Sequence, residues 1–543
     1  MSGTGVQALL AGAPVLVVLV LMTAAGWSAA RAGLVTAVVT LVLAVTAFGF
    51  GGTADPFTAW SGSAGVLAEA AFIALTVVGI IGPALGIHHL QQRTGAALRL
   101  RSGLARLHPD PRLGALLVAW FFALFLEGAA GFGTPVALAA PFLVAAGMPP
   151  LHAVSAAMIG HAAGVSFGAV GTPVLAQTAL VDFTGAELAR ATVPYHVILG
   201  GVLMTAVVLT IGRAFGDTRG LWSWGALAAV AFLVPYGLIA TFVGPELPTL
   251  GGALVGFAVF ALVLVRRRGR AAAGAGPGGA IPAAPPSTPG ATTSPVTGAG
   301  PGAVPAAVPG AAPVAGRELP MVLAAAPYLV LVALVLTTRL VPPLREALQG
   351  VVLEWETGTG FSGSVQPLFH PAVLLTAAFV AGAVLQRAPG RDVRGAVVVA
   401  TLQLGPVLVA LVAMVTIART MSRAGMTDEL ARTAAGVGAA WPLLAPAVGA
   451  FGTFVTGSAT ASNVLFTELQ ATTAETVGLP VLPLLGAQGF GAAVGNLICP
   501  HNIVAAVATV GLTGQEGRVL RSTFPTAVVY VVLGGVLALL LAR

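Results

Sequence analysis

The sequence predicts an all-α polytopic integral membrane protein with about 12–13 transmembrane helices. Hydrophobic residues make up 57% of its 543 residues and charged residues only 8%, whereas a soluble globular protein carries about 25% charged side chains. The 25 basic residues are all arginine, give a net charge of +7, and lie between long apolar runs. These features exclude a water-soluble enzyme, a nucleic-acid-binding domain and a disordered polar chain.

The N-terminal transmembrane half is expected to occupy residues 1–265. We interpret its first apolar run as a retained span, because no basic segment precedes it and no clear cleavage site follows. Five arginines between Arg93 and Arg112 place the loop after the third run in the cytoplasm. The spans of this half are expected at 6–30, 33–50, 64–87, 113–126, 151–180, 193–211, 221–242 and 250–265.

A cytoplasmic linker is expected at residues 266–318. It opens with RRRGR and continues as a chargeless stretch of Ala, Gly and Pro, which cannot form a helix in lipid and is predicted to be disordered. The C-terminal transmembrane half is expected at 319–543. Its spans are predicted at 320–338, 371–386, 396–418, 433–455, 481–512 and 522–542.

The positions of the arginines require one more element than these spans provide. With Arg112 inside, five crossings would leave Arg266 outside, against the positive-inside rule. The remaining candidate is the Gly- and Pro-interrupted segment 128–147, which is typical of a discontinuous or re-entrant helix.

Two segments of the chain share this broken pattern. The first is FLEGAAGFGTPVALAAPFLVAAGMPP (125–150), followed by HAAGVSFGAVGTPV (161–174); the second is GAFGTFVTGSATASNVLFTELQATTAETVGLP (449–480), followed by GFGAAVGNLICPHN (489–502). The helices that enter them are expected to cross in opposite senses. Two such segments predict two inverted-topology halves, each with a re-entrant hairpin, and a binding site at the membrane midplane.

The broken segments also indicate what the site binds. A half-helix that starts inside the membrane presents free N–H groups and a positive dipole end to an anion, and hydroxyls and amides add donors. The alternative, that small residues only allow close helix packing, is preferred for glycines elsewhere. The candidate substrate-binding residues are Gly131, Gly133, Thr134, Thr172, Thr456, Gly457, Ser458, Thr460, Ser462, Asn463, Asn496, His501 and Asn502.

The same strings resemble the L-lactate/glycolate permease family. Its EGAAGFGTP, TGS-x-T-x-SN and LQATTA elements all occur here in order, and the likeness is strongest over 110–180 and 434–526. His161 and the residues Cys499 to Asn502 depart from the family pattern. The resemblance implies a two-hairpin transporter fold and a proton-coupled importer of L-lactate, D-lactate and glycolate in the plasma membrane.

Several ionisable residues fall inside the predicted spans. Glu127 is costly to keep charged at such a depth, so it could carry the coupled proton; alternatively it caps the broken helix that follows. Glu69 is expected at the interface, paired to an arginine. Arg419 and Arg423 are expected to snorkel, with pairing of Arg419 to the substrate carboxylate as the alternative. His161 could also hydrogen-bond a hydroxy acid.

Other functions remain to be weighed. A sodium-coupled carrier of another organic anion is the main alternative, because the TGSATASN tip could supply oxygens to Na⁺. A membrane enzyme is disfavoured, since the sequence has neither a clustered metal-ligand set nor a nucleotide-binding loop, and a channel needs no paired broken segments. No cofactor, metal or nucleic-acid partner is expected. The expected partners are the monocarboxylate, protons and the lipid bilayer.

Overall fold

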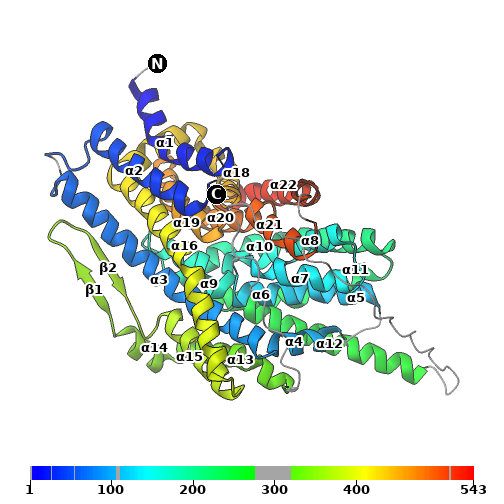
Figure 1. Ribbon diagram of the computed structural model, residues 1–543. Helices are drawn as coiled ribbons and strands as arrows, with labels where there is room; N and C mark the ends of the chain where they lie inside the picture. Colours follow the sequence, from blue (N-terminus) through cyan, green and yellow to red (C-terminus); the bar gives the residue numbers. More distant parts are fainter. Residues whose placement is uncertain are drawn as a thin grey trace.

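The computed structural model describes residues 3–25, 27–53, 55–105, 110–131, 133–274, 319–512 and 515–543. These residues form a helical bundle with one small β-hairpin (Figure 1). Eleven of the described helices are long and apolar enough to cross a membrane, and shorter apolar helices lie beside them. The predicted all-α, multi-span fold class is therefore confirmed.

The chain begins with three helices and a short fourth. Thr58 starts the third with a capping box, in which its side chain bonds the amide of Ser61 and Ser61 bonds back. That helix has 35 residues, about 50 Å at 1.5 Å per residue, so it must tilt to remain in a bilayer. The four are α1 (Gly3–Thr23), α2 (Ala29–Ala47), α3 (Ala59–Arg93) and α4 (Ala96–Ala105).

The next two elements form a hairpin, hairpin 1, with a tip at Ala130–Gly133. Its first leg joins α5 (Pro111–Leu116), a π-helical segment (Leu117–Phe122) and α6 (Ala123–Ala129); its second leg is α7 (Thr134–Ala145). The 12 residues of α7 reach about 18 Å, well short of the roughly 30 Å hydrocarbon core. This hairpin contains the segment predicted to be re-entrant.

A broken helix follows hairpin 1. Its parts are α8 (Pro150–His161), a 3₁₀ segment (Ala162–Phe167) and α9 (Gly168–Thr178), and the break is marked by left-handed backbone at Ala169, Val170 and Gly171. The half ends with α10 (Gly185–Phe215), α11 (Leu221–Phe242) and α12 (Pro248–Gly274). The helix α12 thus runs beyond residue 265, and residues 275–318 of the predicted linker lie outside the described residues.

The C-terminal half begins with α13 (Met321–Leu340) and α14 (Pro342–Gln349). The antiparallel strands β1 (Leu353–Glu356) and β2 (Ser362–Val365) follow, with Leu353 opposite Val365. They contact α3 at the edge of the molecule (Figure 1). Next come α15 (Pro371–Leu385), α16 (Gly390–Arg423) and α17 (Met426–Ala434).

A second hairpin and a second broken helix complete the half. Hairpin 2 is formed by α18 (Trp441–Thr456) and α19 (Ala459–Val477), with its tip at Gly457–Ser458. The broken helix is α20 (Val481–Gly495) and α21 (Pro500–Thr509), and α22 (Glu516–Leu541) closes the chain. The order long helix, short helix, hairpin, broken helix, long helix therefore occurs twice, starting from α3 and from α16, which pack side by side.

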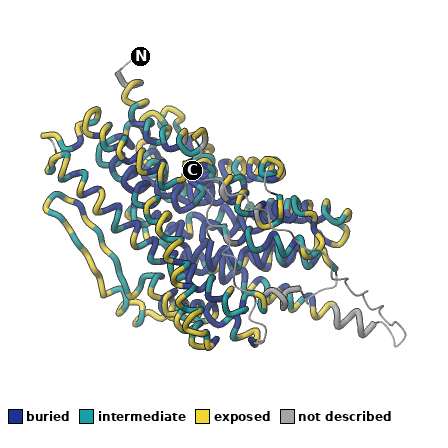
Figure 2. The backbone as a smooth tube through the Cα atoms, viewed as in Figure 1, coloured by how far each residue is buried: buried dark blue, intermediate teal, exposed yellow. Residues whose placement is uncertain are grey.

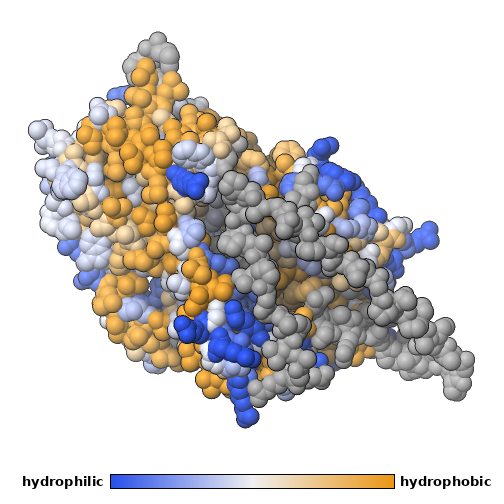
Figure 3. Space-filling view, viewed as in Figure 1, coloured by the Kyte–Doolittle hydropathy of each residue, from blue (hydrophilic) through white to orange (hydrophobic). Residues whose placement is uncertain are grey.

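The burial pattern separates a core from a broad apolar surface. The middle of the bundle is largely buried (Figure 2), and the 18-residue window of the helix Pro150–Thr178 is 100% buried. The outer helices instead expose large apolar side chains such as Leu402 and Phe242. Figure 3 shows a wide hydrophobic face over α1, α2 and α16. An exposed apolar surface of this extent suits contact with lipid.

Candidate functional site

Four interrupted elements pack against one another in the middle of the bundle. The second leg of hairpin 1, α7, packs on α21 of the second broken helix, and α19 of hairpin 2 packs on α9 of the first broken helix. Val165 at the first break shares a buried apolar cluster with Ala459 at the second tip. Each half of the chain therefore supplies a hairpin tip that meets the broken helix of the other half.

The tip of hairpin 1 lies against the second break. Gly131 and Gly133 have φ values of 57° and 78°, in the left-handed region that glycine tolerates best. A Cβ atom on Gly133 would come within 2.9 Å of the Asn502 Oδ1 atom. Asn502 in turn hydrogen-bonds to Asn496 across the gap between α20 and α21. Four predicted site residues therefore lie together; the side chains of Thr134 and His501 lie outside those described.

The first break has an unusual backbone. Ala169 and Val170 have φ values of 42° and 56°, which are strained for residues with a Cβ atom and most of all for a β-branched valine. The predicted site residue Thr172 stabilises the turn by donating its hydroxyl to the carbonyl of Ala169 at 2.6 Å. Strain that is held in place by the surrounding structure is common at ligand sites.

Glu127 lies in this cluster. Its side chain is buried, and its Oε1 atom occupies the space that a side chain on Gly168 would need. The carboxylate therefore packs against the backbone at the start of α9. This position is compatible with both predicted roles of Glu127, the proton carrier and the helix cap. Both therefore stay predictions.

The tip of hairpin 2 places its hydroxyls in local hydrogen bonds. Gly457 has a φ of 78° and ends α18. The Ser458 hydroxyl accepts the amide N–H of Ala461 at 3.4 Å and so caps α19. Thr456 donates its hydroxyl to the carbonyl of Gly452 at 2.8 Å. The buried Thr460 lies one residue into α19.

Two further predicted residues on α19 make contacts away from the tip. Ser462 donates to the carbonyl of Gly449 at 2.8 Å, which ties the two legs of hairpin 2 together. Asn463 donates from Nδ2 to the carbonyl of Pro173 at 3.0 Å, which ties hairpin 2 to α9. Gln488 donates to the Asn463 Oδ1 atom at 3.4 Å. The Asn463 amide thus joins hairpin 2 to both broken helices.

Sequence reasoning missed several polar residues around the breaks. Ser166 donates to the carbonyl of Gly489 at 2.9 Å and lies 2.8 Å from His196 Nε2; His196 Nδ1 lies 3.1 Å from the Tyr530 hydroxyl. Gln177 of α9 donates to Thr467 of α19 at 3.2 Å. Their signal in the sequence is a single polar residue within an apolar run, which is too common to identify a site.

Two groups of ionic side chains lie near the broken elements. Glu69 pairs with Arg423 at 2.5 Å, so the predicted arginine partner of Glu69 is observed. Arg419 pairs with Glu468 at 2.9 Å and donates to the carbonyl of Ala179 at 2.6 Å, while its predicted snorkelling stays a prediction. The interior contact is favoured because Glu468 is itself buried and needs a cation. The second group, Glu246 and Arg339, was not predicted.

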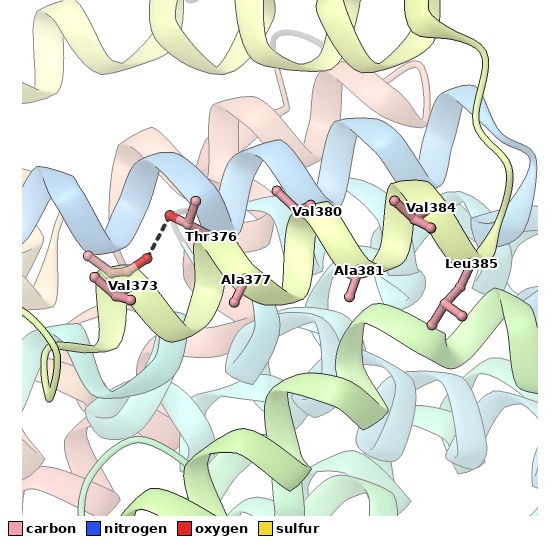
Figure 4. A pocket seen from close by; sticks show the side chains of 8 residues that line it. Val373, Thr376, Ala377, Val380, Ala381, Val384 and Leu385 are labelled. Carbon is pink, nitrogen blue, oxygen red and sulfur yellow. Dashed lines mark hydrogen bonds between the residues drawn. The ribbon is translucent and has the colours of Figure 1, made fainter. Parts of the chain in front are cut away.

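Three further features of the described residues were considered as parts of a binding site: a buried histidine, possible metal ligands and a surface groove. The buried His161 lies 2.8 Å from the carbonyl of Ala157 through Nδ1, and its Nε2 atom has no partner. No group of three or more described His, Cys, Asp or Glu side chains is placed to hold a metal ion. An open groove of about 780 Å³ runs along α15 (Figure 4). Its lining has no charged side chain, so it does not suit an anion.

Comparison with known proteins gives consistent matches along the chain. A family profile described as L-lactate permease matches residues 7–284 and 315–543. An L-lactate permease of Bacillus subtilis is 29% identical over 91% of this chain and 88% of its own length. A glycolate permease of Escherichia coli is 27% identical over 100% of this chain and 97% of its own.

A solved transporter structure shares the fold. The Alcanivorax borkumensis YdaH transporter is 17% identical to this chain, with a TM-score of 0.50, and the match covers 94% of this chain and 98% of that one. At this identity the likeness concerns the arrangement of helices alone. It agrees with the multi-span architecture described above.

Proposed function

Because the chain belongs to the L-lactate permease family, we propose that it imports L-lactate and the related 2-hydroxymonocarboxylates D-lactate and glycolate by proton symport. Membership makes it a multi-pass plasma-membrane transporter rather than an enzyme. One observation carries the proposed mechanism: the tip of each hairpin meets the broken helix of the other half. Such a meeting point changes its packing whenever the two halves move relative to each other.

In this proposal the substrate carboxylate rests on the helix starts at the two tips. The helix α7 begins at Thr134 and α19 begins at Ala459, so each points the free N–H groups of its first turn toward a tip. Thr134, Ser458, Thr460, Ser462 and Asn463 would orient the carboxylate and the hydroxyl. Because several of these groups now bond to the protein, the substrate must replace those bonds as it enters.

The two halves are proposed to have inverted topology. The arginines that follow α3, end α12 and flank the turn between α15 and α16 favour the cytoplasmic side. If both hairpins are re-entrant, α3 then ends inside and α16 ends outside. The proposed division is 1–265 and 319–543 for the two halves, with residues 266–318 as a cytoplasmic linker.

Uptake into proteoliposomes tests the proposed function. Labelled L-lactate should accumulate when the outer solution is more acidic than the lumen, and D-lactate and glycolate should compete. Accumulation should be the same with sodium or with choline as the cation, and a proton ionophore should abolish it. Uptake that follows a sodium gradient and ignores the pH gradient would instead favour the sodium-coupled carrier.

The Ser458→Ala substitution is expected to raise the apparent KM for L-lactate about tenfold, the effect of losing a hydrogen bond to a charged group. Ser28→Ala is a matched control, because Ser28 caps α2 through the amide of Arg31 and lies far along the chain from both tips. Each variant loses one cap, worth about 1 kcal/mol of stability. An equal KM in both variants would show that Ser458 only caps α19 and does not contact the substrate.

A further inference from the structure

Arg339 is the only buried arginine among the residues whose side chains the structure describes. It lies in the last turn of α13, and its Nη2 donates to Glu246 Oε1 at 2.5 Å and to the carbonyl of Phe369 at 3.1 Å. The guanidinium carbon lies 3.5 Å from the centre of the Phe369 ring. The side chains of Arg339 and Glu246 are only 6% and 5% exposed. An ion pair is therefore held inside the protein.

This ion pair is incomplete. The Nε and Nη1 atoms of Arg339 and the Oε2 atom of Glu246 are buried and have no hydrogen-bond partner. Buried polar atoms without partners are costly, and native proteins contain few of them. A guanidinium can hold a carboxylate through two parallel N–H···O bonds, yet Glu246 uses one oxygen. Arg339 therefore has unused capacity for a carboxylate.

Glu246 belongs to a loop that reaches the candidate site. The loop joins α11 to α12, and residues 244–250, from the loop into the first turn of α12, are buried throughout. A side chain on Gly171 would collide with the carbonyl of Pro245, and one on Gly128 would collide with the backbone of Leu250. Thr249 donates to the carbonyl of Gly164 at 2.7 Å. A displacement of Glu246 would thus act on hairpin 1 and on the first break.

The other two arginines that pair with buried carboxylates are more exposed than Arg339, although Arg419 Nε also lacks a hydrogen-bond partner. Arg419 and Arg423 are 24% and 29% exposed and are paired with Glu468 and Glu69. An organic anion that leaves water needs an opposite charge in the interior, because an unpaired buried charge costs several kcal/mol. Among the described arginines, Arg339 is the most deeply buried, so it is the best candidate for the opposite charge.

We propose that Arg339 is the first counter-ion of the transported carboxylate, which takes the place of Glu246 on the guanidinium before it reaches the helix starts at the two tips. Glu246, left without its cation, then accepts a proton from the outer solution. One O–H bond forms on Glu246 and one O–H bond of a hydronium ion in the outer solution breaks, so one proton enters with each monocarboxylate and the net charge of the site is unchanged. This inference rests on the proposed function. It assigns anion binding to Arg339 and proton uptake to Glu246.

The groups around Glu246 leave Arg339 as its main charged partner. Burial and the nearby Arg339 both lower the pKa of His370, so His370 is neutral at neutral pH. On α10, Glu187 bonds to Thr184 and Arg190 donates to the carbonyl of Thr241. On hairpin 1, Glu127 packs against Gly168.

Binding and proton uptake by the purified protein test this pairing directly. Adding L-lactate to concentrated wild-type protein should remove about one proton per bound anion from a weakly buffered solution. Glu246→Gln should bind L-lactate with no proton uptake and with an affinity independent of pH, because the neutral amide resembles protonated Glu246. Arg339→Gln should bind at least about thirtyfold more weakly, the effect of removing one partner of a buried charge pair.

Further variants separate anion binding from a structural role. In Glu246→Gln/Arg339→Gln two amides can still hydrogen-bond; recovery of lactate binding in this double variant would overturn the proposal in favour of a structural link. Arg339→Lys keeps the charge without the fork and should bind more tightly than Arg339→Gln, even if the latter is less stable. Arg432→Gln, which breaks an exposed pair with Glu429, should resemble wild type.

Two outcomes distinguish failure of this inference from failure of the proposed function. If wild-type protein transports L-lactate but Arg339→Gln and Arg339→Lys bind it as tightly as wild type, only the role of Arg339 is overturned. If wild-type protein neither binds nor transports any of the three hydroxy acids, both proposals are wrong.

Discussion

Replacing Glu127 by glutamine is expected to abolish the accumulation of L-lactate driven by a pH gradient, while exchange of labelled for unlabelled lactate continues. Glu127 is buried against the start of α9, where a charged carboxylate is costly and a protonated one is not. Glutamine has nearly the same shape, so the contact with Gly168 persists, but it cannot release a proton. Net symport should therefore stop at a step that exchange does not require.

The measurement compares both modes of transport in the same proteoliposomes. Glu475→Gln is a suitable control, because Glu475 is an exposed carboxylate near the end of α19. The Glu127 variant should also keep the proton uptake on binding that we assign to Glu246, which would place Glu127 later on the proton's path. If accumulation in the Glu127 variant equals that of wild type, Glu127 is a helix cap and the proton is carried by another group.

Hydropathy and the positions of small residues were enough to predict much of the fold. Long apolar runs identify spans because every backbone polar group in lipid must be satisfied within the helix. The glycines at 131, 133 and 457 identified the two tips, and all three have left-handed backbone. The segment 459–477 was not predicted as a leg of its own, because its Thr, Ser and Asn side chains lower its hydropathy.

The side-chain partners could not be predicted, because they depend on how distant helices meet. Glu246 and Arg339 are separated by 93 positions, and neither lies in a motif that marks an ion pair. The position of Glu69 in an apolar run predicted that it pairs with an arginine. It did not predict that this arginine is Arg423. Likewise, GAVG gives no sign that Ala169 and Val170 are left-handed, since their neighbours impose that conformation.

The Asn463→Ala substitution is expected to raise the apparent KM for L-lactate by ten- to hundredfold. Asn463 is fully buried and is one turn from the start of α19, where we place the substrate carboxylate. Losing a hydrogen bond to a charged group costs about 1.5–3 kcal/mol, which corresponds to that range of affinity. The maximal rate, measured per amount of reconstituted protein, should fall less than the affinity.

A second explanation must be separated from this one, because Asn463 also ties hairpin 2 to α9 through the carbonyl of Pro173. Thr467→Val is the matched control: Thr467 lies one turn further along α19, is buried, and accepts a hydrogen bond from Gln177 of α9 at 3.2 Å. Both variants therefore lose one buried bond between α9 and α19, and Asn463→Ala also loses the long bond from Gln488. Only Asn463 lies near the tip. A large rise in KM for Asn463→Ala with a normal KM for Thr467→Val would support contact with the substrate. Equal rises would show that the tie between α9 and α19 matters, and that the binding site lies elsewhere.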